Sequence, residues 1–126
     1  MPLSRRQARR QAIFLLYQWD LSGQEIGSQY AGEIDPWSRG VAEAVAERAP
    51  ELDERITAAA DGWTADRLGT VERSALRVAV HELQSGEVPA EVAINEAVAF
   101  AKRYASDEAG RLVNGILGRI QREEAA

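Results

Sequence analysis

The chain has 126 residues, 45% of them hydrophobic, and a formal net charge of -5. This length allows one domain with a hydrophobic core, so we expect a single domain over residues 1–126. The absence of cysteine excludes disulfides, a thiol nucleophile and a thiolate metal site. No apolar run is long enough for a membrane span or a signal peptide, which predicts a cytoplasmic protein that does not enter a membrane.

Charge is distributed unevenly along the chain. The first nineteen residues contain no acidic side chain and four basic ones, Arg5, Arg6, Arg9 and Arg10. The rest of the chain therefore holds 11 basic and 20 acidic residues, a net charge of -9. This asymmetry predicts that one end of an otherwise acidic protein binds an anionic partner.

The arginines fall at the start of a predicted helix. Ser4 and Gln7 have the spacing of a capping box, which predicts a helix from about Arg5 onward. On that helix the four arginines span an arc of about 140°. A separate stripe of Ala8, Ala12, Leu15 and Trp19 would pack inward. We expect the core to hold the arginine-bearing end in a fixed place.

The nature of the anionic partner can be narrowed. Cations near a helix N-terminus oppose the helix dipole at a cost of a few tenths of a kcal/mol each, which favours a functional reason for them. Gln7 and Gln11 are interleaved with the arginines, a mixture suited to phosphate contacts and hydrogen bonds to bases. A membrane-surface helix would instead need a wide apolar face. We favour nucleic acid, while a merely solvated cationic face stays open as the alternative.

Helical spacing continues to the C-terminus, and no alternating run predicts a strand, so the predicted fold class is all-α. A glycine-containing loop is expected over 22–35, and the last residues, 123–126, are expected to fray. Trp63 is expected to end the buried stripe of the third helix. The predicted helices after the first cover about 36–50, 52–62, a single turn at 64–69, 70–85, 89–105 and 106–122.

The residue types needed for catalysis are not gathered in any recognisable pattern. His81 is the only histidine, and it cannot form a metal site or a triad without partners. Gly110, Gly115 and Gly118 are not followed by the Gly-Lys-Ser/Thr of a phosphate-binding loop. We therefore predict no catalytic residue, no metal and no cofactor, and the chain is not expected to be an enzyme.

Two asparagines interrupt apolar helical stretches. Asn95 and Asn114 lie among aliphatic residues, where Asn is mildly disfavoured in a helix. We expect both amides to satisfy backbone groups where helices meet, and contact with a ligand is the alternative.

Seven short stretches, in four parts of the chain, form a specific pattern. They are RRQAR at 5–9 with LYQW at 16–19, VERSALR at 71–77, VP at 88–89 with AINEAV at 93–98 and AK at 101–102, and RLVNGIL at 111–117. In these segments the chain resembles the bacterial NusB family of transcription antitermination factors. The resemblance implies two small helical bundles packed across each other, the first over about 4–62 and the second over about 64–121.

The resemblance also implies a function without catalysis. It implies binding of the single-stranded boxA element of ribosomal RNA leaders, together with ribosomal protein NusE, in an RNA polymerase complex that suppresses termination. Tyr17 and Glu72 would face NusE. At position 112 this chain has Leu where many relatives have Phe, so an aliphatic side chain replaces a ring that could stack on a base. The implied RNA contacts are Arg5, Arg6, Gln7, Arg9, Arg10, Lys102, Arg111 and Leu112.

The sequence also allows other functions to be considered. A NusB-like module begins an rRNA cytosine methyltransferase, but these 126 residues contain no Gly-rich cofactor loop and no cysteine, so we do not expect that enzyme. A helical protein-binding adaptor, whose arginines dock on an acidic protein, is the alternative function. The free protein could also form a homodimer through the exposed part of the first helix.

Overall fold

A computed structural model describes residues 2–125, which form six α-helices and one short 3-10 helix. The all-α prediction is confirmed by this architecture and by the comparisons reported below. The elements are α1 (Arg5–Ser22), α2 (Pro36–Glu47), α3 (Ala49–Ala59), η1 (Ala65–Arg67), α4 (Thr70–Ser85), α5 (Ala90–Tyr104) and α6 (Asp107–Ala125).

Local sequence signals explain most of the helix boundaries. Asp35 accepts a hydrogen bond from the Trp37 amide at 2.9 Å, and Pro36 occupies the first turn, so α2 begins as predicted. Ser106 accepts from the Ala109 amide at 3.0 Å at the start of α6. Gly86 takes a left-handed conformation, with φ of 70°, that ends α4.

Three expectations at helix ends are corrected by the structure. The break between α2 and α3 lies at Arg48, and Pro50 belongs to the first turn of α3, where a proline needs no amide partner. Trp63 is 51% exposed rather than buried, because α3 ends at Ala59, four residues before it. Residues 123–125 are not frayed, since α6 extends to Ala125 and Arg55 on α3 contacts the carboxylates of Glu123 and Glu124; residue 126 lies outside the described residues.

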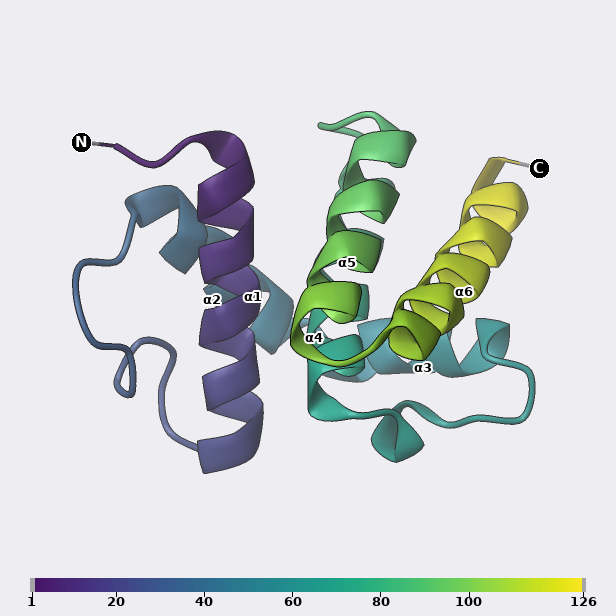
Figure 1. Cartoon of the computed structure of the whole chain (residues 1–126), viewed down its shortest axis with the longest axis horizontal. Helices are drawn as coiled ribbons and strands as arrows, with labels where there is room; N and C mark the ends of the chain where they lie inside the picture. The colour runs from purple at the N-terminus through teal and green to yellow at the C-terminus, as the bar shows by residue number, and fades with distance from the viewer. Residues whose placement is uncertain (1, 126) are drawn as a thin grey trace.

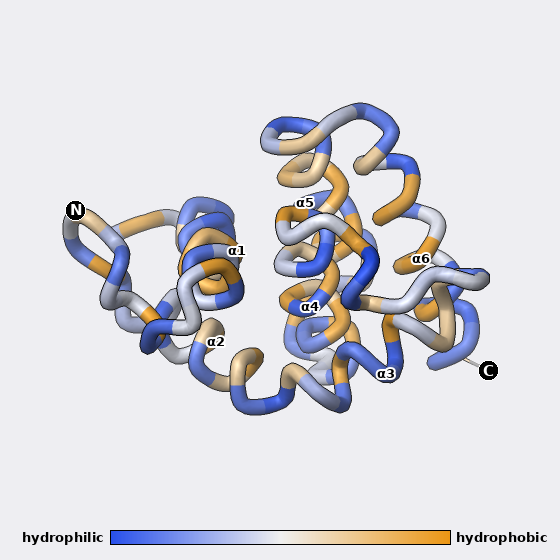
Figure 2. The backbone as a smooth tube through the Cα atoms, turned by 90° about the horizontal axis from the view of Figure 1, so that it is seen from below, coloured by the Kyte–Doolittle hydropathy of each residue, from blue (hydrophilic) through white to orange (hydrophobic). Residues whose placement is uncertain are grey.

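The helices are arranged around α4. Figure 1 shows α1, α2 and the loop between them on one side of the molecule, with α5 and α6 on the other side. In Figure 2 the same arrangement is seen from below, with α4 and α5 between α1 and α6. Contacts join α4 to each of the other five α-helices, and α3 packs on α4 and α6 as well as on α2. The division into bundles over 4–62 and 64–121 stays a prediction.

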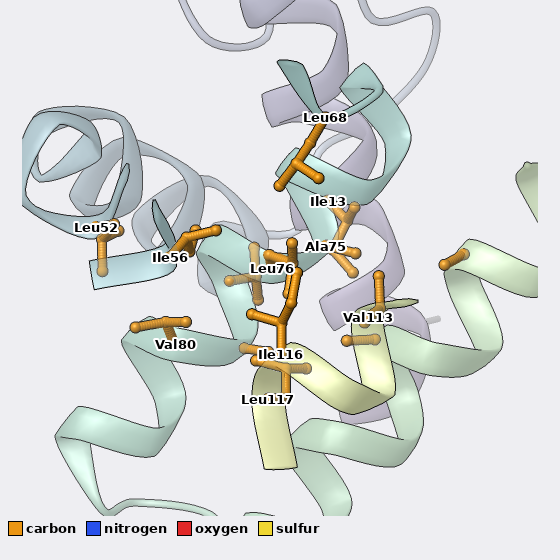
Figure 3. Close-up of a cluster of buried hydrophobic side chains, with 14 of the residues drawn as sticks. Ile13, Leu52, Ile56, Leu68, Ala75, Leu76, Val80, Val113, Ile116 and Leu117 are labelled. Atoms are coloured by element: carbon orange, nitrogen blue, oxygen red, sulfur yellow. The ribbon is translucent and has the colours of Figure 1, made fainter. Parts of the chain in front are cut away.

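One hydrophobic core connects these helices. Ile13 of α1, Leu76 of α4 and Leu117 of α6 are almost completely excluded from solvent and belong to one cluster, part of which is drawn in Figure 3. Burying an aliphatic side chain of this size stabilises the fold by about 1.5–3 kcal/mol. The core thus fixes α1 against α4 and sets the positions of the side chains on the outer surface of α1. Within residues 2–125, no helix is long and apolar enough to cross a membrane.

Candidate nucleic-acid interface

The arginine-bearing end of α1 begins with the predicted capping box. The Ser4 hydroxyl accepts from the Gln7 amide at 3.1 Å, and the Gln7 side-chain oxygen accepts from the Ser4 amide at 2.9 Å. The cap satisfies two backbone donors that would otherwise be unpaired. Gln7 is exposed, and its side-chain NH2 group remains free to donate to a ligand.

The four arginines do not form one cationic face, and Arg9 in particular does not point to solvent. Its side chain is 4% exposed, and its Nε donates to both carboxylate oxygens of Glu82 on α4, at 2.7 and 3.0 Å. Its implied role as an RNA contact is therefore corrected. A guanidinium buried against a carboxylate would need to leave an ion pair and the core to reach a phosphate.

Arg5 and Arg6 are exposed, and each is held by a neighbouring helix. The guanidinium of Arg5 lies over the ring of Trp37 on α2, 4.3 Å from the ring centroid, in a cation-π contact. The Nε of Arg6 contacts a carboxylate oxygen of Glu96 on α5 at 2.9 Å. The Arg6 side chain keeps 63% of its surface exposed. These contacts orient both guanidinium groups without covering them.

Arg10 is half-buried and lines a cavity between α1 and the loop over 23–35. Among the residues that the structure describes, no ion pair involves Arg10, whereas Arg6 and Arg9 each have one. Arg10, like Arg5, therefore has no carboxylate partner in an ion pair within the described residues, which suits it to an external anion.

The predicted contacts on α5 and α6 lie close to one another. Lys102 is exposed near the end of α5, and its aliphatic stem passes over Gly110 of α6 so closely that a Cβ at position 110 would collide with it. Arg111, which follows Gly110 directly, is exposed. Leu112 is half-buried and lines a cavity of about 380 Å³ together with Trp63. A glycine at 110 therefore places Lys102 beside the start of α6.

Tyr17 and Glu72, the predicted partner positions, lie on α1 and α4. Tyr17 is half-buried and lines a cavity of about 160 Å³ with Val71, the neighbour of Glu72 in the sequence. The Glu72 carboxylate accepts from the Gly69 amide at 2.9 Å and so caps α4. Any partner that binds Glu72 thus meets a carboxylate that already stabilises a helix end.

Several features of this region are not what the sequence pattern predicts. Asn95 and Asn114 are both exposed, and neither amide makes a hydrogen bond among the described residues, so the expected backbone-satisfying role is wrong. Sequence reasoning missed Trp37 and Glu96, which hold Arg5 and Arg6. Glu96 directly follows Asn95 in the AINEAV segment, but only the folded structure brings it to Arg6.

Across residues 2–125, no group of three or more His, Asp or Glu side chains could hold a metal ion. The site consists of exposed cations, amides and aromatic rings on a rigid helical framework. Such a set of groups binds anions and planar groups through hydrogen bonds, charge and stacking.

Comparison with known proteins agrees with this framework. The family model described as the NusB family matches residues 6–122. The chain belongs to the NusB family. It is 39% identical to the transcription antitermination protein NusB of Salinispora tropica, over 93% of this chain and 94% of that protein. The NusB family comprises transcription antitermination factors rather than enzymes, in agreement with the prediction that the chain is not catalytic.

Solved NusB structures have the same fold. NusB of T. maritima superposes with a TM-score of 0.86 at 31% identity, covering 98% of this chain and 94% of that one. A crystal structure of the antitermination factors NusB and NusE in complex with dsRNA contains a chain that superposes with a TM-score of 0.81 at 29% identity. That match covers 94% of this chain and 96% of that one.

Proposed function

We propose that this NusB-family chain binds the single-stranded boxA element of ribosomal RNA leaders together with ribosomal protein NusE, and that the assembly joins transcribing RNA polymerase to suppress termination. The protein would act in the cytoplasm, without a cofactor and without catalysis. The relative solved with NusE and double-stranded RNA supports the two classes of partner.

The observation that carries the proposal is the position of the arginine end of α1. The Arg6–Glu96 contact joins this end to α5, the helix that carries Lys102, and Lys102 in turn lies over α6 beside Arg111. Exposed cations are therefore carried by three helices, α1, α5 and α6, of which α5 contacts both of the others. A strand of RNA running from α6 across α5 to α1 would meet them in succession. We propose Arg5, Arg6, Gln7, Arg10, Lys102, Arg111 and Leu112 as its contacts.

NusE would bind beside this path. Tyr17 lies two helical turns after Arg10 on the same helix, and Glu72 lies at the start of α4. We propose these two residues as NusE contacts, which would place protein and RNA on adjoining parts of one surface.

Because Arg9 is buried in the core, α1 contributes three arginines to RNA binding. At about 0.7 released counterions per phosphate contact, they give a log-log salt slope of only about -2 for the α1 contribution. We therefore expect RNA alone to bind modestly and NusE to strengthen the complex.

The test is a fluorescence-anisotropy titration of a boxA-containing leader RNA and a scrambled RNA, with and without NusE. The variant Arg6→Ala/Arg10→Ala should weaken binding of boxA RNA about tenfold or more and make the salt slope shallower by about 1.4. The control Arg55→Ala/Arg119→Ala removes the same charge from α3 and the second half of α6 and should bind as the wild type does.

Selective binding that NusE strengthens and the α1 substitutions weaken supports the proposal. Equal weak binding of both RNAs, unchanged by NusE or by the substitutions, would overturn it. If the chain then still bound a protein partner through its arginines, it would be the helical adaptor instead. Sedimentation of the free protein would show whether α1 also supports a homodimer.

A further inference from the structure

A cavity of about 620 Å³ opens between α1 and the loop over 23–35. Its walls include the side chains of Phe14, Tyr30 and Ile34, and Gln7 and Arg10 lie along its α1 side. We call it the α1–loop pocket. In Figure 1 this loop lies beside the purple helix, on the side away from α5. The pocket adjoins two of the proposed RNA contacts but is not accounted for by them.

A buried side-chain amide, that of Gln11, holds the loop side of the pocket in place. Gln11 is 7% exposed, and its side-chain nitrogen donates to the Tyr30 hydroxyl at 3.1 Å and to the Glu33 carbonyl at 3.0 Å. Its side-chain oxygen accepts from the Asp35 amide at 2.9 Å. Buried polar groups with all partners satisfied rigidify their surroundings. An irregular loop is thereby fixed to α1, and the pocket is formed before any ligand arrives.

The charges around the pocket indicate which part of a nucleotide can enter it. Glu33 and Asp35 also line the pocket, and their carboxylates would repel a phosphate there. Arg10 lies on the α1 side and has no ion pair among the described residues, so a phosphate would lie there instead. The Tyr30 ring and Ile34 offer apolar surface to a flat group, while the Phe14 ring packs edge-on against Phe100 and Tyr104 of α5. This combination suits a base against Tyr30 and Ile34 and its phosphate beside Arg10.

We propose that the α1–loop pocket receives one unstacked base of the bound single-stranded RNA, with Arg10 on the adjoining phosphate. Proteins that read single-stranded RNA commonly take unstacked bases onto aromatic side chains in this way. An ionised carboxylate only accepts hydrogen bonds, so Glu33 favours a base that presents an amino group. The inference rests on the proposed function and adds a base-reading site that lies away from α5 and α6.

The experiment scans the boxA leader RNA with single abasic nucleotides, which remove a base and keep its phosphate. Because one stacked base is lost, an abasic nucleotide at one position should weaken wild-type binding by about tenfold. Tyr30→Ala should weaken binding of the intact RNA by a similar factor, and in this variant the abasic change at that position should hardly alter the affinity further. Tyr30→Phe keeps the ring, so the abasic change should still weaken its RNA binding nearly as much as in the wild type.

Glu33→Gln is the second variant, because Glu33 is exposed and its substitution does not disturb the core. It should reduce the preference for an amino-bearing base at the sensitive position while leaving the other positions unchanged. If Tyr30→Ala loosens the loop, this variant still tests the proposal. A competing occupant is a protein segment: if Tyr30→Ala weakened NusE binding in the absence of RNA, the base assignment would be overturned.

The outcomes separate this inference from the proposed function. If no abasic position mattered, or if the sensitive position were unaffected by Tyr30→Ala and Glu33→Gln, the pocket would not hold a base. In that case selective boxA binding weakened by Arg6→Ala/Arg10→Ala would still support the proposed function. If the wild-type protein bound boxA and scrambled RNA equally well, the proposed function itself would be contradicted.

Discussion

The Nε of Arg9 donates to both oxygens of Glu82 in a position where the two side chains are 4% and 6% exposed. At this depth the attraction between the charges offsets the cost of removing both from water only while the pair is intact. The same contact fixes the spacing of α1 and α4. Within one turn of α1, Arg9 thus stabilises the fold, whereas Arg10 lines an open cavity.

The first prediction concerns this buried pair. Glu82→Ala should lower the free energy of unfolding by about 3 kcal/mol, because it leaves the Arg9 guanidinium buried without its carboxylate. The double change Arg9→Met/Glu82→Leu should recover most of that loss, since it removes both charges and keeps apolar volume. Urea unfolding followed by circular dichroism measures both variants.

Arg6→Ala serves as the control for that measurement. It removes a largely exposed partner of Glu96 and should cost less than about 1 kcal/mol. If Arg9→Ala left the urea midpoint unchanged but weakened RNA binding as strongly as Arg6→Ala, Arg9 would be an RNA contact and the buried assignment would be wrong.

At the scale of whole elements, the junction of α2 and α3 is held by Arg48. Its guanidinium contacts Glu51 at 2.9 Å, Gln84 at 2.6 Å and the Nδ1 of His81 at 2.8 Å. Arginine can only donate, so Nδ1 of His81 accepts and the imidazole is neutral with its proton on Nε2. The break between α2 and α3 is thereby tied to the second half of α4.

This contact gives the junction a pH dependence. Burial and the charge of Arg48 lower the pKa of His81 from its usual 6.5, and the carboxylates of Glu82 and Glu87 oppose that shift. A depressed pKa means that the unfolded chain takes up a proton more readily. Stability should therefore be complete above pH 6.5 and fall as the pH drops from there through the folded-state pKa of His81.

The corresponding variant is His81→Gln, whose amide oxygen can still accept from Arg48 but does not titrate. Urea midpoints measured between about pH 7.5 and 5 should decline less steeply in this variant than in the wild type. Because His81 is the only histidine, no other histidine contributes in this window. The pKa of Glu51 is lowered by Arg48, so that carboxyl titrates below its usual 4.5 and outside the window. Equal slopes in the two proteins would show that His81 does not couple to folding.

At the scale of the whole molecule, much of the fold follows from local signals in the sequence. The capping box at Ser4, the Asp35-Pro36 start of α2 and Gly86 at the end of α4 each act within a few residues, and each boundary could be predicted. Helical periodicity of apolar residues likewise predicts the all-α class. The end of α3 could not be predicted in this way, because helical spacing of apolar residues continues to Trp63 although the helix ends at Ala59.

The candidate site could be predicted only in part, because its details depend on contacts between distant residues. The charge pattern predicts a cationic end of α1, but it cannot show that Arg9 turns inward, since Glu82 lies 73 positions away. Nor can it show that Glu96 meets Arg6. The α1–loop pocket depends on Gln11, whose side chain forms hydrogen bonds with three groups of the loop, and no spacing pattern in the sequence predicts these contacts.

A network of ion pairs ties the last turn of α1 to the rest of the molecule. Asp20 accepts from Arg73 at 2.7 Å and from Arg77 at 3.4 Å, both on α4, and Arg77 pairs in turn with Asp53 on α3 at 2.7 Å. The two arginine side chains are only 14% and 6% exposed. Two carboxylates therefore balance two buried guanidinium groups, and α1, α3 and α4 are joined at one point.

Asp20→Asn should lower the free energy of unfolding by about 2 kcal/mol, because hydrogen bonds to charged groups are worth about 1.5–3 kcal/mol and one carboxylate is lost. The control Asp61→Asn removes the 88% exposed partner of Arg119 and should change stability by less than about 1 kcal/mol.

Tyr17 lies one turn before Asp20, so loosening this end of α1 should weaken NusE binding more than RNA binding at the opposite end. Urea unfolding, hydrogen exchange of the α1 amides and separate titrations with NusE and RNA test this. If Asp20→Asn matched its control in stability and weakened both ligands equally, the network would not be what positions this end of α1.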